Sequence, residues 1–89
     1  MIEIQLRLFG KFRSIDSGRS TVRLQIEESS GVNEIKSSLR HYLRETYPGF
    51  SEDALIQDSA IANERQLLTE NDRIDVPCTL AILPPVCGG

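Results

Sequence analysis

The sequence has few of the side chains that usually carry out catalysis. Its 89 residues include no tryptophan, one histidine and two cysteines, Cys78 and Cys87. Two cysteines at this spacing form neither a zinc motif nor the framework of a disulfide-stabilised secreted domain. Phosphate-binding glycine loops and nucleophile motifs are also missing. We therefore expect no metal site and no catalysis by this chain alone, and the expected compartment is the reducing cytoplasm.

Long hydrophobic runs and an excess of positive charge are missing as well. The longest apolar run is four residues, Leu80 to Leu83, whereas a membrane-spanning helix needs about 20. The net charge is −3 and lysine and arginine form no cluster, so neither a membrane nor nucleic acid is expected as a partner. Hydrophobic residues make up 39% of the chain and charged residues 26%, which is typical of one small globular domain.

Two segments near the start alternate apolar and polar residues with the period of a half-buried strand. Residues 2–8 place isoleucine or leucine at every second position, and residues 22–26 repeat the pattern. Between them, Gly10 to Arg13 and Asp16 to Arg19 are typical of a loop and a turn. The two strands are expected to form a hairpin.

The period then changes to that of a helix. Apolar side chains recur at Val32, Ile35, Leu39 and Leu43. A helix is expected to end at Tyr47, before Pro48 and Gly49. The elements expected after it are a helical turn within residues 50–58, a strand at 60–62, a weaker strand at 66–69 and a last strand containing Leu80 and Ile82.

One helix can cover only one face of a sheet. This order of elements therefore predicts an α+β fold, a β-grasp (ubiquitin-like) roll, in which a mixed sheet carries one main helix on its apolar face. The first and last strands are expected to lie side by side. We assign the β-grasp domain to residues 1–83 and a flexible tail to residues 84–89.

The last segment of the sequence reads Leu83-Pro84-Pro85-Val86-Cys87-Gly88-Gly89. Two prolines end a strand and stiffen the chain, so the tail should project from the domain. Two glycines place no side chain behind the terminal carboxylate, which suits insertion into a narrow active site on another protein. The simpler interpretation is an ordinary glycine-rich terminus without a function.

This tail resembles the Pro-Pro-Val-small-Gly-Gly terminus of the small subunit of molybdopterin synthase, in the MoaD/ThiS family of ubiquitin-like sulfur carriers. Phe9-Gly10-Lys11-Phe12-Arg13 is similar to the F-A-x-x-R segment of that family, and Ala62-Asn63 to its V-N strand end. Cys87 is a departure, because serine, threonine or alanine is usual there. The family also carries Gly-Asp-x-Val before its last strand. Of the two stretches that align with it, residues 71–74 and 77–80, we prefer the second, which makes Cys78 a turn residue.

The resemblance implies a carrier whose chemistry lies at Gly88 and Gly89. An E1-like adenylyltransferase would activate the Gly89 carboxylate with ATP and Mg, and a sulfur donor enzyme would displace AMP to leave a thiocarboxylate. The tail residues Pro84, Pro85, Val86 and Cys87 would then enter the large subunit of molybdopterin synthase, where sulfur passes to a pterin precursor. The chain would be the sulfur-donating small subunit of a heterotetrameric transferase in molybdenum cofactor biosynthesis, with no permanently bound cofactor.

Four residues near the tail are candidates for binding these partners. Phe9 and Leu83 fall on the strand faces opposite to the buried sets, so neighbouring parallel strands would place both at the root of the tail as an apolar patch. The alternative is that each is an isolated apolar residue on the surface. Lys11 and Arg13 follow the first strand, where they could pair with acidic groups of a partner.

Other functions are compatible with the same residues. The sulfur acceptor could be a thiazole for thiamine, a cysteine precursor or a tRNA base, although Pro84-Pro85-Val86 favours the molybdopterin case. A ubiquitin-like modifier joined through Gly89 to lysines of other proteins would use the same adenylation, and a plain interaction module would not use the tail. Cys87 is explained better by its small size than by a role as a thiol nucleophile.

Overall fold

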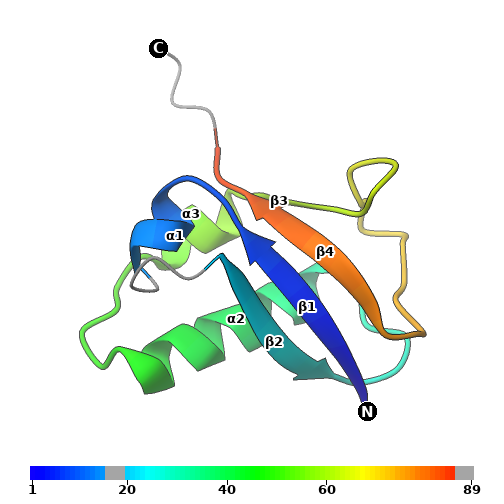
Figure 1. Ribbon diagram of the computed structural model, residues 1–89, viewed down its shortest axis with the longest axis horizontal. Coiled ribbons are helices and arrows are strands. Elements are labelled where there is room, and N and C mark those ends of the chain that lie inside the picture. Colours follow the sequence, from blue (N-terminus) through cyan, green and yellow to red (C-terminus); the bar gives the residue numbers. More distant parts are fainter. Residues whose placement is uncertain (16–19, 86–89) are drawn as a thin grey trace.

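The computed structural model describes residues 1–15 and 20–85 (Figure 1). The elements in this part are β1 (Ile2–Leu8), α1 (Lys11–Ile15), β2 (Thr21–Ile26), α2 (Val32–Thr46), α3 (Asp53–Gln57), β3 (Ala60–Ala62) and β4 (Cys78–Leu83). None of these helices combines the length and the apolarity that crossing a membrane requires.

The four strands form one mixed sheet in the order β2-β1-β4-β3. β1 pairs antiparallel with β2 and parallel with β4, and β3 pairs antiparallel with β4. The long helix α2 lies across one face of this sheet (Figure 1). The arrangement confirms the predicted β-grasp fold and the predicted side-by-side placement of the first and last strands, which are parallel and lie at the centre of the sheet.

The core lies between the apolar face of the sheet and the apolar stripe of α2. Every second residue of β1 and β2 points toward α2, and the apolar side chains of α2 lie on the face of the helix that is turned to the sheet. Full burial of one such aliphatic side chain stabilises the fold by about 1.5–3 kcal/mol. The buried hydrophobic residues are Ile4, Leu6, Leu8, Phe12, Val22, Leu24, Ile26, Ile35, Leu39, Leu43, Ile56, Ile61, Leu80 and Ile82.

The ends of α2 agree with the sequence. The Gly31 N–H donates to Oε1 of Glu34 at 2.6 Å, which satisfies one free donor of the first turn. At the other end the Tyr47 N–H donates to the Leu43 carbonyl at 2.8 Å, and Pro48 prevents continuation. The first turn thus carries an acidic side chain, as the helix dipole favours.

Three local predictions are wrong. Gly10 to Arg13 do not form a loop, because Lys11 begins the short helix α1 and Phe12 is buried with 1% of its surface exposed. Residues 66–69 do not form a strand, because only Leu67 makes a bridge, to Ala62. Cys78 is not a turn residue; it is the first residue of β4 and pairs with Ile4. The turn predicted for residues 16–19 lies outside the described residues.

Candidate functional site at the root of the tail

The predicted tail leaves the sheet at the end of β4. Pro84 and Pro85 follow Leu83 outside any strand, because proline cannot donate to the ladder. Figure 1 shows this point at the same end of the molecule as α1 and the end of β1. Four residues predicted to act in the tail, Val86, Cys87, Gly88 and Gly89, lie outside the described residues. The site is therefore built from the groups around its root.

Phe9 and Leu83 both lie at this root. The parallel register pairs Leu8, the last residue of β1, with Ile82, and Phe9 and Leu83 are the residues that directly follow this pair. Leu8 and Ile82 are buried under the helices, so their successors belong to the opposite, open face of the sheet. Both Phe9 and Leu83 are half-buried rather than fully exposed.

The sheet extends this pair into an apolar patch across three segments. Ala81 lies two residues before Leu83 on the open face and pairs with Ala62 of β3. Ala62 in turn bridges Leu67, which is 57% exposed. We call Phe9, Leu83, Ala81, Ala62 and Leu67 the apolar patch. Sequence reasoning missed the last three, because their position depends on the order β1-β4-β3 rather than on any local pattern.

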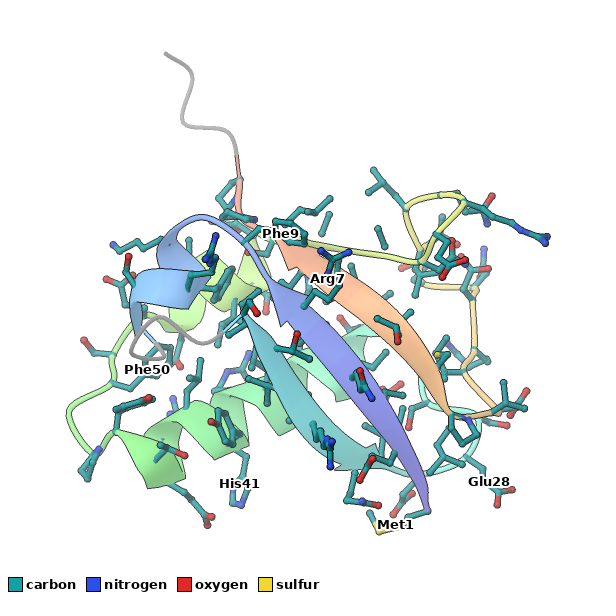
Figure 2. All side chains as sticks on the ribbon, in the orientation of Figure 1. Met1, Arg7, Phe9, Glu28, His41 and Phe50 are labelled. Atoms are coloured by element: carbon teal, nitrogen blue, oxygen red, sulfur yellow. The ribbon has the colours of Figure 1, made fainter. Side chains whose placement is uncertain are left out.

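A cation borders the apolar patch. The guanidinium carbon of Arg7 lies 5.3 Å from the centre of the Phe9 ring (Figure 2). Such a cation–π contact contributes about 0.5–1 kcal/mol at an exposed site. It favours one orientation of the ring on the open face and places a positive charge at the margin of the apolar patch.

The two predicted basic residues have different surroundings on α1. The Lys11 ammonium lies 2.9 Å from Oε2 of Glu52, the residue that precedes α3, so this lysine already connects α1 to α3. Arg13 is exposed and forms no ion pair with any other described residue. Of these two cations, Arg13 is therefore the one whose charge is not neutralised by another described residue.

Gly10 contacts the first residue of the tail. Its φ of +58° is in the left-handed region, and a Cβ added there would lie 2.9 Å from Cγ of Pro84. We expect Gly10→Val to destabilise the domain by about 2 kcal/mol, because a β-branched residue is strained at this φ and displaces Pro84. Thermal unfolding should show a loss of roughly 10 °C.

Gly49 provides the matched control for this substitution. No atom lies within 4 Å of a Cβ added at Gly49, and its φ is not left-handed. Gly49→Val should therefore change the melting temperature far less than Gly10→Val. Equal melting temperatures for the two variants would contradict the requirement for glycine at position 10, beside Pro84.

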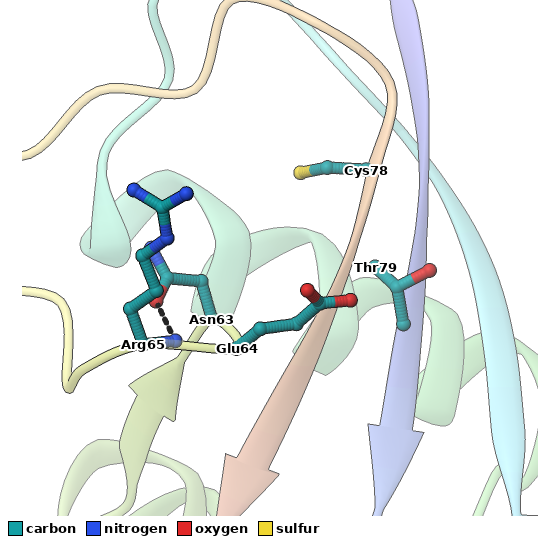
Figure 3. A pocket seen from close by; sticks show the side chains of 5 residues that line it. All are labelled: Asn63, Glu64, Arg65, Cys78 and Thr79. Atoms are coloured by element: carbon teal, nitrogen blue, oxygen red, sulfur yellow. Dashed lines mark hydrogen bonds between the residues drawn. The ribbon is translucent and has the colours of Figure 1, made fainter.

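A shallow hollow of about 430 Å³ lies away from the tail root, lined by Asn63, Glu64, Arg65, Cys78 and Thr79 (Figure 3). The Arg65 N–H donates to Oδ1 of Asn63 at 2.8 Å, which forms a turn. Burial raises the pKa of the Cys78 thiol above its ordinary value, so the thiol stays protonated at neutral pH and is a poor nucleophile. Among the described residues no group of three histidine, cysteine or acidic side chains is placed to hold a metal ion.

Known proteins resemble this chain in their structures rather than in their sequences. No protein-family model matches the sequence, and neither does any curated protein. SAMP1 from Haloferax volcanii matches over 98% of this chain and 99% of its own, with 20% identity and a TM-score of 0.66. The Pyrococcus furiosus protein described as "Putative molybdopterin converting factor, subunit 1" matches over 97% of this chain and 100% of its own, with 17% identity and a TM-score of 0.68. Over essentially its whole length, the chain thus has the β-grasp fold of these ubiquitin-like proteins.

Proposed function

We propose that this protein is a cytoplasmic sulfur carrier that acts as the small subunit of a molybdopterin synthase. The observation that carries the proposal is the position of the tail. The sequence Pro-Pro-Val-Cys-Gly-Gly follows β4, a central strand of a β-grasp domain, and its first residue, Pro84, leaves the strand beside the apolar patch. Similarity to a molybdopterin converting factor subunit supports the same assignment.

The chemistry of the proposal lies in the Gly89 carboxylate. A carboxylate is a poor acyl donor, because its leaving group would be oxide. An E1-like partner would join it to AMP from ATP, with Mg, and release pyrophosphate. A sulfur donor enzyme would then supply sulfide sulfur, which attacks the acyl carbon and expels AMP, leaving a thiocarboxylate at Gly89. Acid, base and phosphate-binding groups would come from the partners, since the described residues form no such site.

The apolar patch supplies the docking surface in this proposal. Exposed apolar residues that are grouped together and bordered by charges are typical of interfaces between proteins. Arg7 and Arg13 lie at the margin of the patch or on the neighbouring helix α1, where they can pair with carboxylates of a partner. Docking here would direct Pro84 and the residues after it toward the partner's active site. The large subunit of molybdopterin synthase and the activating enzyme would thus use overlapping surfaces.

The test is the intact mass of the protein after incubation with extract of its host, ATP and a sulfur source. We expect a gain equal to the replacement of one oxygen by sulfur, located at Gly89 by fragmentation. Deletion of Gly89 should abolish the gain, whereas the matched variant Cys87→Ser should retain it. A loss of the gain in Cys87→Ser would instead assign a chemical role to that thiol. Unmodified protein in an active extract would contradict the proposal.

A ubiquitin-like modifier is the second candidate, and the likeness to small archaeal modifier protein 1 from H. volcanii favours it. In that case Gly89 would be joined through an isopeptide bond to lysines of other proteins. The same incubation distinguishes the two, because conjugates of high molecular weight would appear and would depend on Gly89. Addition of purified thiazole, pterin or tRNA acceptors to the thiocarboxylated protein would identify the acceptor of sulfur.

A further inference from the structure

The two edges of the sheet differ in how they are covered. At the β3 edge the chain folds back on itself: the Leu68 N–H donates to the Ile61 carbonyl at 2.7 Å, and the Asn63 N–H donates to the Gln66 carbonyl at 3.0 Å. At the β2 edge, none of the described residues beyond β1 pairs with the strand. An uncovered edge strand presents a row of unpaired donors and acceptors to other chains.

The backbone groups available on β2 follow from its pairing with β1. The Leu8 N–H donates to the Ser20 carbonyl at 2.8 Å, so the hydrogen-bonded pairs in this ladder occur at Ser20 and then at every second residue. Residues 22, 24 and 26 therefore bond to β1. The N–H and carbonyl groups of Thr21, Arg23 and Gln25 point outward, away from the sheet.

A furrow runs beside this edge, between β2 and α2. Its volume is about 450 Å³, and its lining residues are Arg23, Leu24, Gln25, Ser37, Ser38, His41, Tyr42 and Glu45. Figure 1 shows the second half of α2 extending past the edge of β2, and His41 lies on this part of the helix (Figure 2). The helix thus forms a ledge beneath the space that an added strand would occupy.

The part of α2 that extends past β2 distinguishes between two possible partners of this edge, a second copy of the chain and a single extended peptide. In a symmetric pair of copies joined through β2, each α2 would extend beneath the β2 of the other copy. That space is already filled by the other copy's own α2, which buries Val22, Leu24 and Ile26. A single extended peptide brings no helix of its own, so it fits above the ledge without this conflict.

The side chains on either side of the edge define the chemistry of such a peptide. A residue opposite Leu24 would point into the furrow, against Leu24 and the ring of Tyr42, and would be aliphatic. A residue opposite Arg23 would lie on the open face. Arg23 forms no ion pair with any described residue, so an acidic side chain there would neutralise it. Aliphatic residues would therefore occupy the positions that face the furrow, and an acidic residue would lie opposite Arg23 on the other face.

We propose that the free edge of β2 binds an extended segment of a partner protein by strand addition, with aliphatic side chains in the β2–α2 furrow and an acidic side chain at Arg23. The main chain of the segment would pair with Thr21, Arg23 and Gln25. This site is separate from the apolar patch, because β1 lies between β2 and β4. A partner could therefore hold the domain here while the tail remains accessible.

The experiment uses the full chain labelled with ¹⁵N and the blocked heptapeptide acetyl-Ser-Val-Asp-Ile-Glu-Val-Ser-amide. We expect saturable shifts of the amide signals of residues 21–25 and 37–45 at peptide concentrations up to about 2 mM. In two further forms of the peptide, every second amide is N-methylated. One form carries the methyl groups at the odd-numbered residues and the other at the even-numbered residues. Strand addition predicts that one form loses binding and the other keeps it, because only every second N–H faces β2.

Two protein variants with the same charge change test the acidic contact. Arg23→Glu should weaken binding about fivefold or more, since it replaces an attraction with a repulsion. Arg65→Glu, in the exposed turn near the β3 edge, should leave the affinity unchanged. Absence of shifts, shifts confined to the apolar patch, or equal loss of binding by both N-methylated peptides would overturn the proposal. Dimers of the peptide-free protein in sedimentation, abolished by Arg23→Glu, would overturn it in favour of a second copy.

Discussion

Leu83→Glu is expected to weaken strongly the binding of the proposed activating enzyme and of the proposed large subunit while the domain stays folded. Leu83 lies, like Phe9, on the open face of the sheet, directly before Pro84. An interface formed there would bury the new carboxylate among apolar side chains with no partner. Central interface residues of this kind contribute at least about 2 kcal/mol, so the affinity should fall by roughly 30-fold or more.

Thr79→Glu is the matched control for this result. Thr79 lies on the same strand and the same face of β4, four residues before Leu83 and away from the root of the tail. It is exposed, so both variants gain one negative charge on the open face. Calorimetric titration with each purified partner should show near-normal affinity for Thr79→Glu. Equal affinities for Leu83→Glu and the unmodified protein would remove the apolar patch from the docking surface.

The central sheet and the long helix could be predicted from the sequence because their periods are long and unbroken. Seven residues of β1 alternate without interruption, and α2 has an apolar stripe over four turns. The mixed sheet followed from the single face that one helix can cover, and the side-by-side placement of the first and last strands followed from the fold type rather than from any local motif. These features are the ones that the structure confirms.

The surroundings of the tail could be predicted only in part. In the sequence, Phe9 and Leu83 are apolar residues that fall on the face opposite to the buried set, and in the structure both directly follow the paired residues Leu8 and Ile82. The contact between Gly10 and Pro84 joins residues more than seventy positions apart, and the pairing of Lys11 with Glu52 joins the first residue of α1 to the residue before α3. Such contacts depend on the tertiary arrangement and leave no pattern in the sequence.

The helix α1 was missed for a physical reason that leads to the second large effect. Five residues are too few to show a helical period, and an isolated helix of this length does not form in water. Its stability must therefore come from packing, and Phe12 is the side chain that provides it, with 1% of its surface exposed. The Phe12 N–H donates to the Phe9 carbonyl at 3.2 Å, which connects the helix directly to the apolar patch.

Phe12→Ala is expected to destabilise the protein by about 3–5 kcal/mol, because it removes a buried ring and leaves a cavity. A domain of this size has a free energy of unfolding of roughly 5–13 kcal/mol, so a large share of the stability would be lost. Urea unfolding followed by circular dichroism measures this change. Phe12→Leu conserves most of the volume and should cost less than about 1.5 kcal/mol.

Phe50 allows the effect of burial to be separated from the loss of an aromatic ring. It is half-buried and packs at the edge of the core, near α1 (Figure 2), so Phe50→Ala should cost clearly less than Phe12→Ala. If both alanine variants lost the same stability, Phe12 would not be the anchor of α1. If Phe12→Ala is the more damaging, its folded fraction should also bind partners weakly, because α1 carries Arg13 and follows Gly10, which lies next to Pro84. Packing of one side chain beneath α1 would then control both the stability of the domain and the direction in which its tail leaves.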